Sequence, residues 1–250
     1  MDANNKCGYI NIYCKILLKK HEKNSFILLL LIVAVPLYAE QVFYTRGSSD
    51  IKEIALSFDD GPGLNTKDIL KILDKKDVKA TFFLLGTSVV KRPKLVKEIY
   101  SKGHELANHT YNHMNFFRYD EETGKEEKIK EELLSCQDLI RDITGYRTKL
   151  VRFPHGYLRE DAIEIAKETN YKIINWTFGI DWERDLDQEE MLKLYLENAK
   201  PGTIFLMHDL QKNPKIVKML PALIDKLKEK KYNFVTVGEM INKRNQEEKL

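Results

Sequence analysis

Strand-like and helix-like segments alternate along residues 45–245, and this alternation constrains the fold more than any other feature. Short apolar runs rich in β-branched and aromatic residues predict buried strands, and segments with apolar residues at helical spacing lie between them. The predicted strands are Ile54–Phe58, Lys79–Leu85, Gly103–Asn108, Leu150–Arg152, Tyr171–Trp176, Thr203–His208 and Asn233–Val237. The predicted helices are Thr66–Asp74, Pro93–Lys102, Thr123–Ile143, Asp161–Thr169, Glu189–Ala199 and Ile216–Lys230. Strands joined by helices pair in parallel, so the sequence predicts an α/β layer or barrel, and about seven such units favour a barrel.

Composition places the chain among globular proteins with a charged surface. Of its 250 residues, 43% are hydrophobic and 32% are charged, which is enough to bury one sizeable core. The formal net charge of +3 comes entirely from residues 1–39, and the rest of the chain has equal numbers of basic and acidic side chains. No nucleic-acid partner is therefore expected. A monomer is expected.

The apolar run Phe26–Ala39 follows the basic stretch Lys19–Lys23. It is short for a membrane span and has the length of the apolar part of a signal peptide. Residues 1–39 are therefore predicted to be a basic N-terminal region with a signal peptide or an uncleaved membrane anchor. The remaining part, residues 45–245, is predicted to be an exported catalytic domain that is secreted or attached to the cell envelope.

Three cysteines give no disulfide framework within one chain. Cys7 and Cys14 precede the apolar run, so only Cys136 belongs to the predicted domain. Cys136 shares a helical face with Leu133 and Ile140, which predicts a small core residue.

Polar side chains stand at or just after the ends of several predicted strands. They are Asp59, Asp60, His109, Arg152, Asp181 and His208. In α/β barrels the carboxyl ends of the strands form the rim on which chemistry is built, so these residues are expected to gather there.

The stretch Ser57–Pro62 (SFDDGP) places two adjacent carboxylates where a buried strand ends. Adjacent carboxylates stay ionised only when a cation or hydrogen-bond donors offset their repulsion. This arrangement favours a site, and the alternative is an Asp-Gly turn with solvated carboxylates.

His109 and His113 are four residues apart, a spacing that on a helix lets two imidazoles bind one metal ion. The spacing is similar to that of the zinc-protease helix, but Thr110 stands where that motif has its glutamate base. A third ligand would then come from Asp59 or Asp60. The alternative is a pair of surface or capping histidines.

Arg152 follows a predicted strand and could hold a carboxylate ionised and oriented. Gly156, four residues later, would let a backbone N–H approach a reacting oxygen. Trp176 and Trp182 could wall a ligand cleft, and His208 beside a carboxylate could act as an acid. The alternatives are a Pro-Gly turn with an exposed arginine, tryptophans packed in the core, and a buried core histidine.

Five stretches resemble, in order and spacing, the polysaccharide deacetylases of carbohydrate esterase family four, the NodB homology domain. They are Ser57–Pro62, His109–His113, Arg152–Gly156, Asp181-Trp182 and Leu206–His208, and the resemblance covers about residues 50–242. The resemblance implies a distorted (β/α) barrel with fewer than eight units. It also implies a metal-dependent hydrolase of acetylated polysaccharides.

The resemblance carries residue roles to the matching positions of this chain. It implies that Asp59 is the catalytic base and that Asp60, His109 and His113 bind a divalent metal, usually Zn²⁺, with Co²⁺ or Mn²⁺ as alternatives. It implies that Arg152 orients Asp59, that His208 is the general acid and that Asp181 pairs with it. Trp182 and Leu206 would form the pocket for the acetyl methyl group, and the backbone N–H of residue 155 would donate to the oxyanion, beside Gly156.

Two departures from the family pattern concern the surroundings of the substrate. Phe178 stands where the family has the first aspartate of its fourth motif, and His155 stands where it usually has Tyr or Phe. The expected activity is removal of N-acetyl groups from amino sugars, with peptidoglycan as the first expected substrate and His155 as a cleft residue. An O-acetyl esterase acting on xylan or another glycan, and a catalytically silent glycan-binding barrel, are the alternatives.

Overall fold

The computed structural model describes residues 41–119, 124–210 and 214–247. Residues 40–250 form one compact unit. The predictions for residues 1–39, which include the signal peptide or anchor, Cys7 and Cys14, fall outside the described residues. Among the helices that are described, none combines the length and the apolar character needed to cross a membrane.

One sheet of eight parallel strands forms the centre of the described structure. The strands are β1 (Phe43–Tyr44), β2 (Glu53–Gly61), β3 (Thr81–Leu84), β4 (Glu105–Asn108), β5 (Leu150–Val151), β6 (Lys172–Ile174), β7 (Thr203–His208) and β8 (Asn233–Val235). Their order is β1-β6-β5-β4-β3-β2-β7, and β8 pairs with the start of β2. Single bridges from Arg46 to Thr203 and from Phe178 to Phe205 join the far side of the sheet to β7. These bridges bring the two sides of the sheet together as in a barrel.

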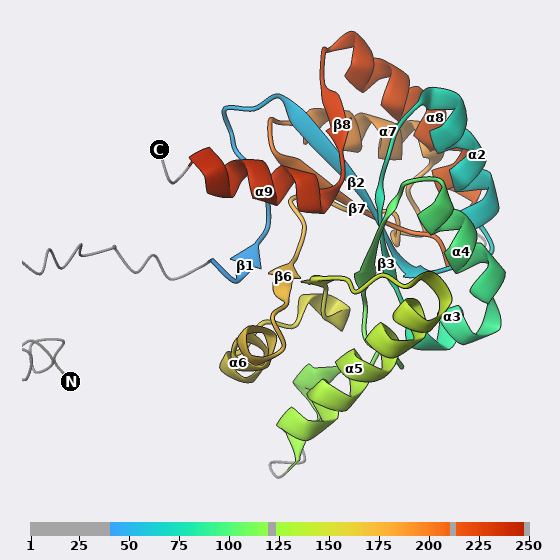
Figure 1. The fold of residues 1–250 in the computed structure, drawn as a ribbon. Coiled ribbons are helices and arrows are strands. Elements are labelled where there is room, and N and C mark those ends of the chain that lie inside the picture. The colour runs from blue at the N-terminus through green and yellow to red at the C-terminus, as the bar shows by residue number, and fades with distance from the viewer. Residues whose placement is uncertain (1–40, 120–123, 211–213, 248–250) are drawn as a thin grey trace, which may run out of the picture. The chain divides into compact units, whose positions relative to one another are not determined.

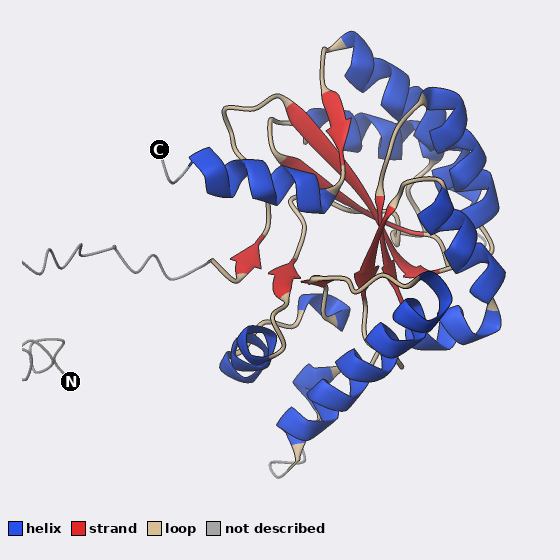
Figure 2. Cartoon of the chain, in the orientation of Figure 1, coloured by secondary structure: helices blue, strands red, loops and turns tan. Residues whose placement is uncertain are grey.

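The described helices lie around the strands, which Figures 1 and 2 show crossing near the centre of the view. The helices are α2 (Thr66–Lys76), α3 (Gly86–Lys91), α4 (Pro93–Ser101), α5 (Lys125–Thr144), α6 (Glu160–Glu168), α7 (Gln188–Glu197), α8 (Pro214–Glu229) and α9 (Val237–Glu247). Two short 3₁₀-helices, η2 (Phe116–Arg118) and η3 (Pro154–Gly156), lie in loops after β4 and β5. The prediction of an α/β barrel with about seven strands is confirmed, with β1 as an additional short strand.

Side-chain alternation along β2 explains how the sheet is covered on both faces. Ile54, Leu56 and Phe58 point to the core shared with the outer helices. Ala55 points the other way, into a cluster with one residue from each of several other strands, such as Phe83 of β3 and Ile204 of β7. A strand buried on both faces reads as a continuous apolar run, which is how β2 reads until Asp59.

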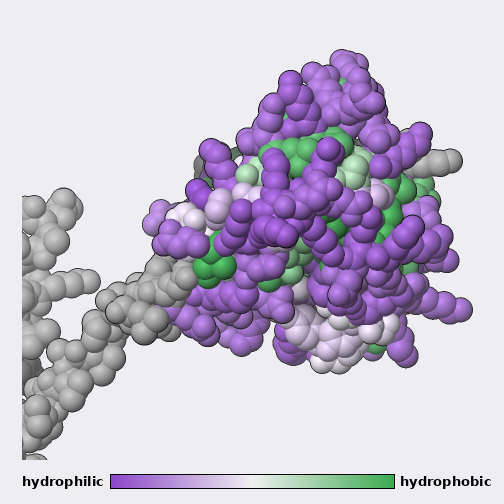
Figure 3. Space-filling view, turned by 90° about the horizontal axis from the view of Figure 1, so that it is seen from above, coloured by the Kyte–Doolittle hydropathy of each residue, from purple (hydrophilic) through white to green (hydrophobic). Residues whose placement is uncertain are grey.

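Two outer cores and one inner core hold the fold together. The larger outer core packs α2, α3, α4, α7 and α8 against β2, β3 and β7, and it includes Cys136, as predicted. A second outer core packs α5 and α6 against β5 and β6. The inner core is completed by Val237, Met240 and Ile241 of α9. Figure 1 shows α9 lying beside β8 and β1, and Figure 3 shows that the face seen from above is mostly hydrophilic.

Apart from the two 3₁₀-helices, three described elements were not predicted, namely β1, α3 and α9. β1 has two residues, which is too short for a periodic signal. α3 has six residues and includes two β-branched valines after a glycine. α9 has a weak apolar pattern, because only its first two turns carry apolar residues that reach the inner core.

Candidate active site

A cleft of about 410 Å³ lies at the carboxyl ends of the strands. The predicted site residues that line it are Asp59, Asp60, His109, His113, His155, Gly156, Trp182, Leu206 and His208. Phe153 and Trp176 line it as well. Arg152 and Asp181, the two remaining predicted residues, are buried behind this surface and contact Asp59 and His208.

Asp59 lies at the top of β2 with a buried guanidinium beneath it. Arg152 Nη1 donates to Asp59 Oδ1 at 2.6 Å and to Ser57 Oγ at 3.0 Å. Both partners are almost completely buried, with Arg152 0% and Asp59 2% exposed. A buried carboxylate paired with a cation is favoured in its ionised form. Asp59 is therefore held as an oriented carboxylate that can accept a proton from a group in the cleft.

Asp60, His109 and His113 form a cluster whose ligand atoms all lie within 4.8 Å of one another. Asp60 Oδ1 is 3.4 Å from His109 Nε2 and 3.3 Å from His113 Nε2. These distances are longer than a normal N–H···O bond, and the buried oxygen has no hydrogen-bond partner in the described structure. Burial alone would raise the pKa of the Asp60 carboxyl, but His109 and the other nearby imidazoles, in their protonated forms, outweigh it and lower that pKa to about 2.

A backbone carbonyl fixes the tautomer of His109. His109 Nδ1 lies 2.6 Å from the carbonyl oxygen of Arg152. Because a carbonyl oxygen only accepts hydrogen bonds, Nδ1 carries a proton, and in the neutral imidazole Nε2 has the lone pair, on the side that faces Asp60. One carboxylate oxygen and imidazole nitrogens aimed at a common point are the donor set of a divalent transition-metal site.

The two histidines lie on a loop, not on the helix for which their four-residue spacing was considered. Thr110 has a φ of +68° and His113 a φ of +59°, both left-handed and incompatible with a continuous helix. The imidazole rings still lie close, with centroids 5.1 Å apart. The loop conformation, and not the periodicity of a helix, therefore brings the two rings together.

Glu132 of α5 holds this loop in place, a role that was not predicted from the sequence. Its Oε2 accepts from the backbone N–H groups of Tyr111 at 3.0 Å and Asn112 at 2.7 Å. Its Oε1 accepts from Asn112 Nδ2 at 2.9 Å. Glu132 is only 2% exposed. Its position next to Leu133, on the apolar face of an amphipathic helix, is the feature of the sequence that could have indicated this role.

Asp209 holds the turn after Asp60 in the same manner. Its carboxylate accepts from Thr66 Oγ1, and Thr66 Oγ1 accepts from the Gly63 amide at 2.6 Å. A Cβ at Gly61 would lie 2.2 Å from Asp209 Oδ1, so only glycine lets the chain pass this close. The conformation of the Asp-Asp-Gly-Pro-Gly motif thus depends on Asp209, a fully buried acid one residue after His208.

His208 and Asp181 form a hydrogen-bonded pair across the cleft from His109. Asp181 Oδ1 accepts from His208 Nδ1 at 2.9 Å, and Oδ2 accepts from the His208 backbone N–H at 2.8 Å. Burial alone would lower the pKa of His208, but the hydrogen bond and negative charge of Asp181 outweigh it and raise that pKa to about 9. The imidazolium form is therefore favoured at neutral pH, with Nε2 left free of Asp181.

Apolar and backbone groups complete the cleft. Trp182 stacks edge-on against His208 with ring centroids 5.9 Å apart, and Leu206 is almost fully buried beside it. The Gly156 amide is used inside the turn, where it donates to the Phe153 carbonyl at 3.1 Å. The His155 amide has no acceptor among the described residues, so it is the backbone donor open to a ligand.

Comparison with known proteins places this geometry in a family. The polysaccharide deacetylase family model matches residues 46–174. A peptidoglycan-N-acetylglucosamine deacetylase of Bacillus cereus is 35% identical over 195 residues, which are 75% of this chain and 68% of the relative. The chain spans less of the peptidoglycan-N-acetylglucosamine deacetylase PgdA of Listeria monocytogenes, with 33% identity, 76% of this chain and 39% of that relative.

Solved structures agree with the family model in fold. The Bc1960 peptidoglycan N-acetylglucosamine deacetylase superposes with a TM-score of 0.75 at 32% identity, covering 81% of this chain and 94% of that chain. A CE4 family pseudoenzyme from Bacillus anthracis superposes with a TM-score of 0.71 at 30% identity, covering 79% of this chain and 68% of that chain. Both the sequence match and the shared barrel lead to one conclusion. The chain belongs to the polysaccharide deacetylase family.

Proposed function

We propose that this enzyme is a metal-dependent N-deacetylase that removes acetyl groups from the amino sugars of peptidoglycan. The observation that carries the proposal is the placement of an acid and a base on one cleft. Asp59, hydrogen-bonded to Arg152, and His208, protonated beside Asp181, both line the cleft that the Asp60–His109–His113 cluster adjoins. A hydrolysis that needs proton removal at one atom and proton delivery at another fits these two groups.

Asp60, His109 and His113 are the residues that would hold the metal ion. The unpartnered buried oxygen of Asp60 and the fixed tautomer of His109 both support a cation between them. One carboxylate and two imidazoles suit Zn²⁺, with Co²⁺ or Mn²⁺ as alternatives. A divalent cation held there supplies Lewis acidity beside the scissile amide.

The side chains of the cleft supply the remaining chemistry. Asp59 takes a proton from the attacking water, which adds to the acetamide carbonyl carbon. The His155 amide donates to the oxygen that becomes negatively charged. His208 Nε2 gives its proton to the amine nitrogen as the C–N bond breaks, and acetate and a free amine result. Trp182 and Leu206 pack around the acetyl methyl group.

Peptidoglycan is proposed as the substrate because similar proteins are named peptidoglycan N-acetylglucosamine deacetylases. The N-terminal run Phe26–Ala39, predicted to direct export, supports a substrate outside the cytoplasm. His155 replaces the aromatic residue that the family usually has at the edge of the cleft, and it is proposed to contact the substrate there.

Acetate release from three substrates tests the function. Purified peptidoglycan, chitopentaose and acetylxylan are incubated with the protein, and both free acetate and new amino groups are measured. We expect acetate and amino groups in equal amounts from peptidoglycan. Acetate from acetylxylan alone would replace the N-deacetylase with an O-acetyl esterase. No acetate from any of them, with metal present, would indicate a silent glycan-binding barrel.

A further inference from the structure

The edge of the cleft beside His155 carries three exposed side chains that the proposed reaction does not use. Phe117 and Arg118 belong to η2, and Arg159 directly precedes α6. Phe117 is 44% exposed, which is unusual for a large aromatic side chain. Both arginines are exposed as well.

Packing fixes this aromatic and cationic surface in position. The Phe117 ring meets the Tyr157 ring at right angles, with centroids 4.8 Å apart. The Arg159 guanidinium lies 5.4 Å from the Phe117 ring centre and 5.9 Å from that of Tyr157. Asn115 caps η2 by accepting from the Phe117 amide at 3.1 Å, and Phe116 anchors the turn in the core. Three contacts of this kind leave Phe117 and Arg159 little freedom to move.

Tyr157 links this surface to the cleft. The His155 ring packs against the metal-cluster residue His113 with centroids 4.9 Å apart, and Tyr157 follows His155 by two residues. Arg118 directly follows Phe117 in η2, so it belongs to the same surface.

Within the described ranges, neither Arg118 nor Arg159 forms an ion pair with a carboxylate. Asp161, the acidic side chain that contacts Tyr157, is occupied by the Tyr157 hydroxyl at 2.7 Å and by Lys125 at 3.5 Å.

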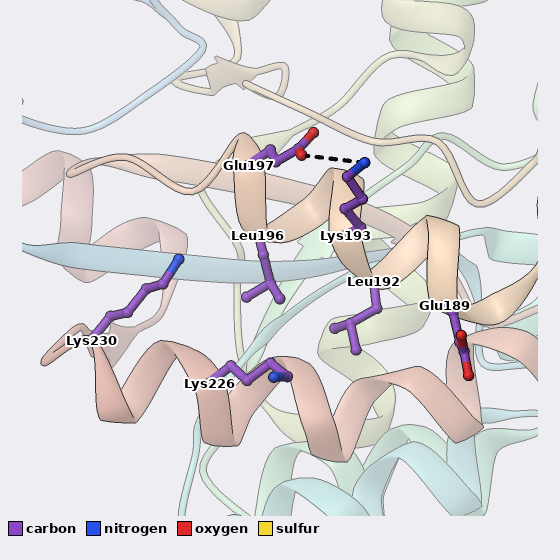
Figure 4. A pocket seen from close by; sticks show the side chains of 7 residues that line it. All are labelled: Glu189, Leu192, Lys193, Leu196, Glu197, Lys226 and Lys230. Carbon is purple, nitrogen blue, oxygen red and sulfur yellow. Dashed lines mark ion pairs between the residues drawn. The ribbon is translucent and has the colours of Figure 1, made fainter.

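A hollow between α7 and α8 shows the opposite arrangement (Figure 4). There the lysines of the rim alternate with Glu189 and Glu197, and Lys193 pairs with Glu197 at 3.9 Å. That hollow has two carboxylates among its three lysines, whereas Phe117, Arg118 and Arg159 include no carboxylate.

We propose that Phe117, Arg118 and Arg159 form a subsite for a carboxylate-bearing part of the polysaccharide next to the sugar that is deacetylated. The exposed side of Phe117 packs against a sugar ring, and the two guanidinium groups pair with the carboxylate. The inference rests on the proposed function and narrows its substrate to an anionic glycan. Peptidoglycan carries such carboxylates on its stem peptides, or on muramic acid where the stem peptide is absent, whereas chitopentaose carries none.

The test compares a charged substrate with its neutral counterpart and with a neutral glycan. A soluble peptidoglycan fragment, the same fragment with its carboxylates converted to amides, and chitopentaose are assayed with the wild-type chain and with the double variant Arg118→Gln/Arg159→Gln. We expect the double variant to lose about tenfold in kcat/KM on the anionic fragment, as two partly exposed ion pairs would give. Activity on the amidated fragment and on chitopentaose is expected to stay unchanged.

Lys230→Gln is the matched control for charge. Lys230 follows α8 and leads into the amino end of β8, so it lies at the opposite end of the strands from the cleft. This variant should behave as the wild type on all three substrates. Raising the salt concentration should reduce the wild-type preference for the anionic fragment and leave the double variant unaffected.

Equal losses on charged and neutral substrates, or no loss at all, would overturn the subsite. Equilibrium binding of the two fragments to Asp59→Asn chains, with and without the arginine substitutions, gives an answer that does not depend on turnover. The subsite predicts about tenfold tighter binding of the anionic fragment, lost with the arginines. A wild-type chain that binds the anionic fragment tightly and releases no acetate would contradict the proposed function alone.

Discussion

The guanidinium of Arg152 fills the inside of the barrel directly below the cleft. Besides Asp59 and Ser57 of β2, it donates to the carbonyl oxygens of Ile174 and Asn175, each at 3.1 Å. It also stacks on Phe83 with 4.0 Å between the guanidinium carbon and the ring centre. A buried charge is stable only when its hydrogen bonds are satisfied, and here they come from β2 and from the end of β6. One side chain therefore ties the position of the base to the assembly of the sheet.

The pairing of His208 with Asp181 predicts the alkaline limit of the reaction. The acid works only when protonated, so kcat/KM should fall as pH rises through about 9, the pKa of His208. Asp181→Asn removes the negative charge that opposes burial. The pKa of His208 should then drop, and the alkaline limb should move to lower pH. Profiles of kcat/KM against pH, with metal content verified at each point, measure this shift.

The variant His208→Ala measures how much the general acid contributes to the rate. A single general acid contributes on the order of 10²–10⁴ in rate, so this variant should lose that much on an amide substrate. An alkaline limb that stays in place in Asp181→Asn would show that the pair does not set it. Near wild-type activity of His208→Ala would remove His208 from the acid role.

At the scale of elements, α5 supports the loop that carries His109 and His113. Glu132→Ala would leave the amides of Tyr111 and Asn112 without their acceptor. Residues that orient metal ligands typically change metal affinity by about 10–100-fold, so the variant should bind Zn²⁺ more weakly by that factor. Competition with a chelator of known affinity measures the change.

Glu131→Ala is the control from the same helix turn. Glu131 is exposed and pairs with Lys128 at 2.7 Å on the surface, where ion pairs contribute little. It should leave Zn²⁺ affinity unchanged. If Glu131→Ala and Glu132→Ala weaken binding equally, the loop does not depend on the buried carboxylate.

The sequence was most informative where local pattern and tertiary structure agree. β2, β3, β7 and the longer helices could be predicted because burial on both faces, or on one helical stripe, leaves a periodic pattern. The loop that carries His113 could not be predicted, because its left-handed conformation depends on hydrogen bonds to Glu132, some twenty positions later. Glu132 and Asp209 support the site through contacts with residues that are distant in the sequence, and a local sequence pattern does not contain such contacts. The family motifs nevertheless located nine of the residues that line the cleft.

In the whole described unit, the carboxyl end of the barrel carries the cleft and the amino end contributes to stability. The cleft occupies the carboxyl ends of the strands, and α9 packs its apolar residues into the inner core beside the start of β2. Met240 is 2% exposed and contacts this core. Met240→Ala should cost about 2–5 kcal/mol of unfolding free energy, the usual cost of truncating a buried side chain. Because this end does not line the cleft, kcat/KM of the folded protein should remain unchanged.

Denaturant unfolding together with activity measured well below the midpoint separates these two effects. Asn242→Ala, at an exposed position of the same helix, should change neither. A large loss of kcat/KM in folded Met240→Ala would mean that the amino end of the barrel and the cleft are coupled.

The central claim is that Asp60, His109 and His113 hold a metal ion while Asp59 acts as the base. Metal content and acetate release, measured on the same samples of wild type, Asp60→Ala and Asp59→Asn, test it most directly. Wild type stripped by a chelator should be inactive and should recover with one equivalent of Zn²⁺. Asp60→Ala should bind little Zn²⁺. Asp59→Asn should bind one Zn²⁺ per chain and still lose on the order of 10²–10⁴ in rate. Full acetate release by metal-free wild type, or by Asp59→Asn, would contradict the claim.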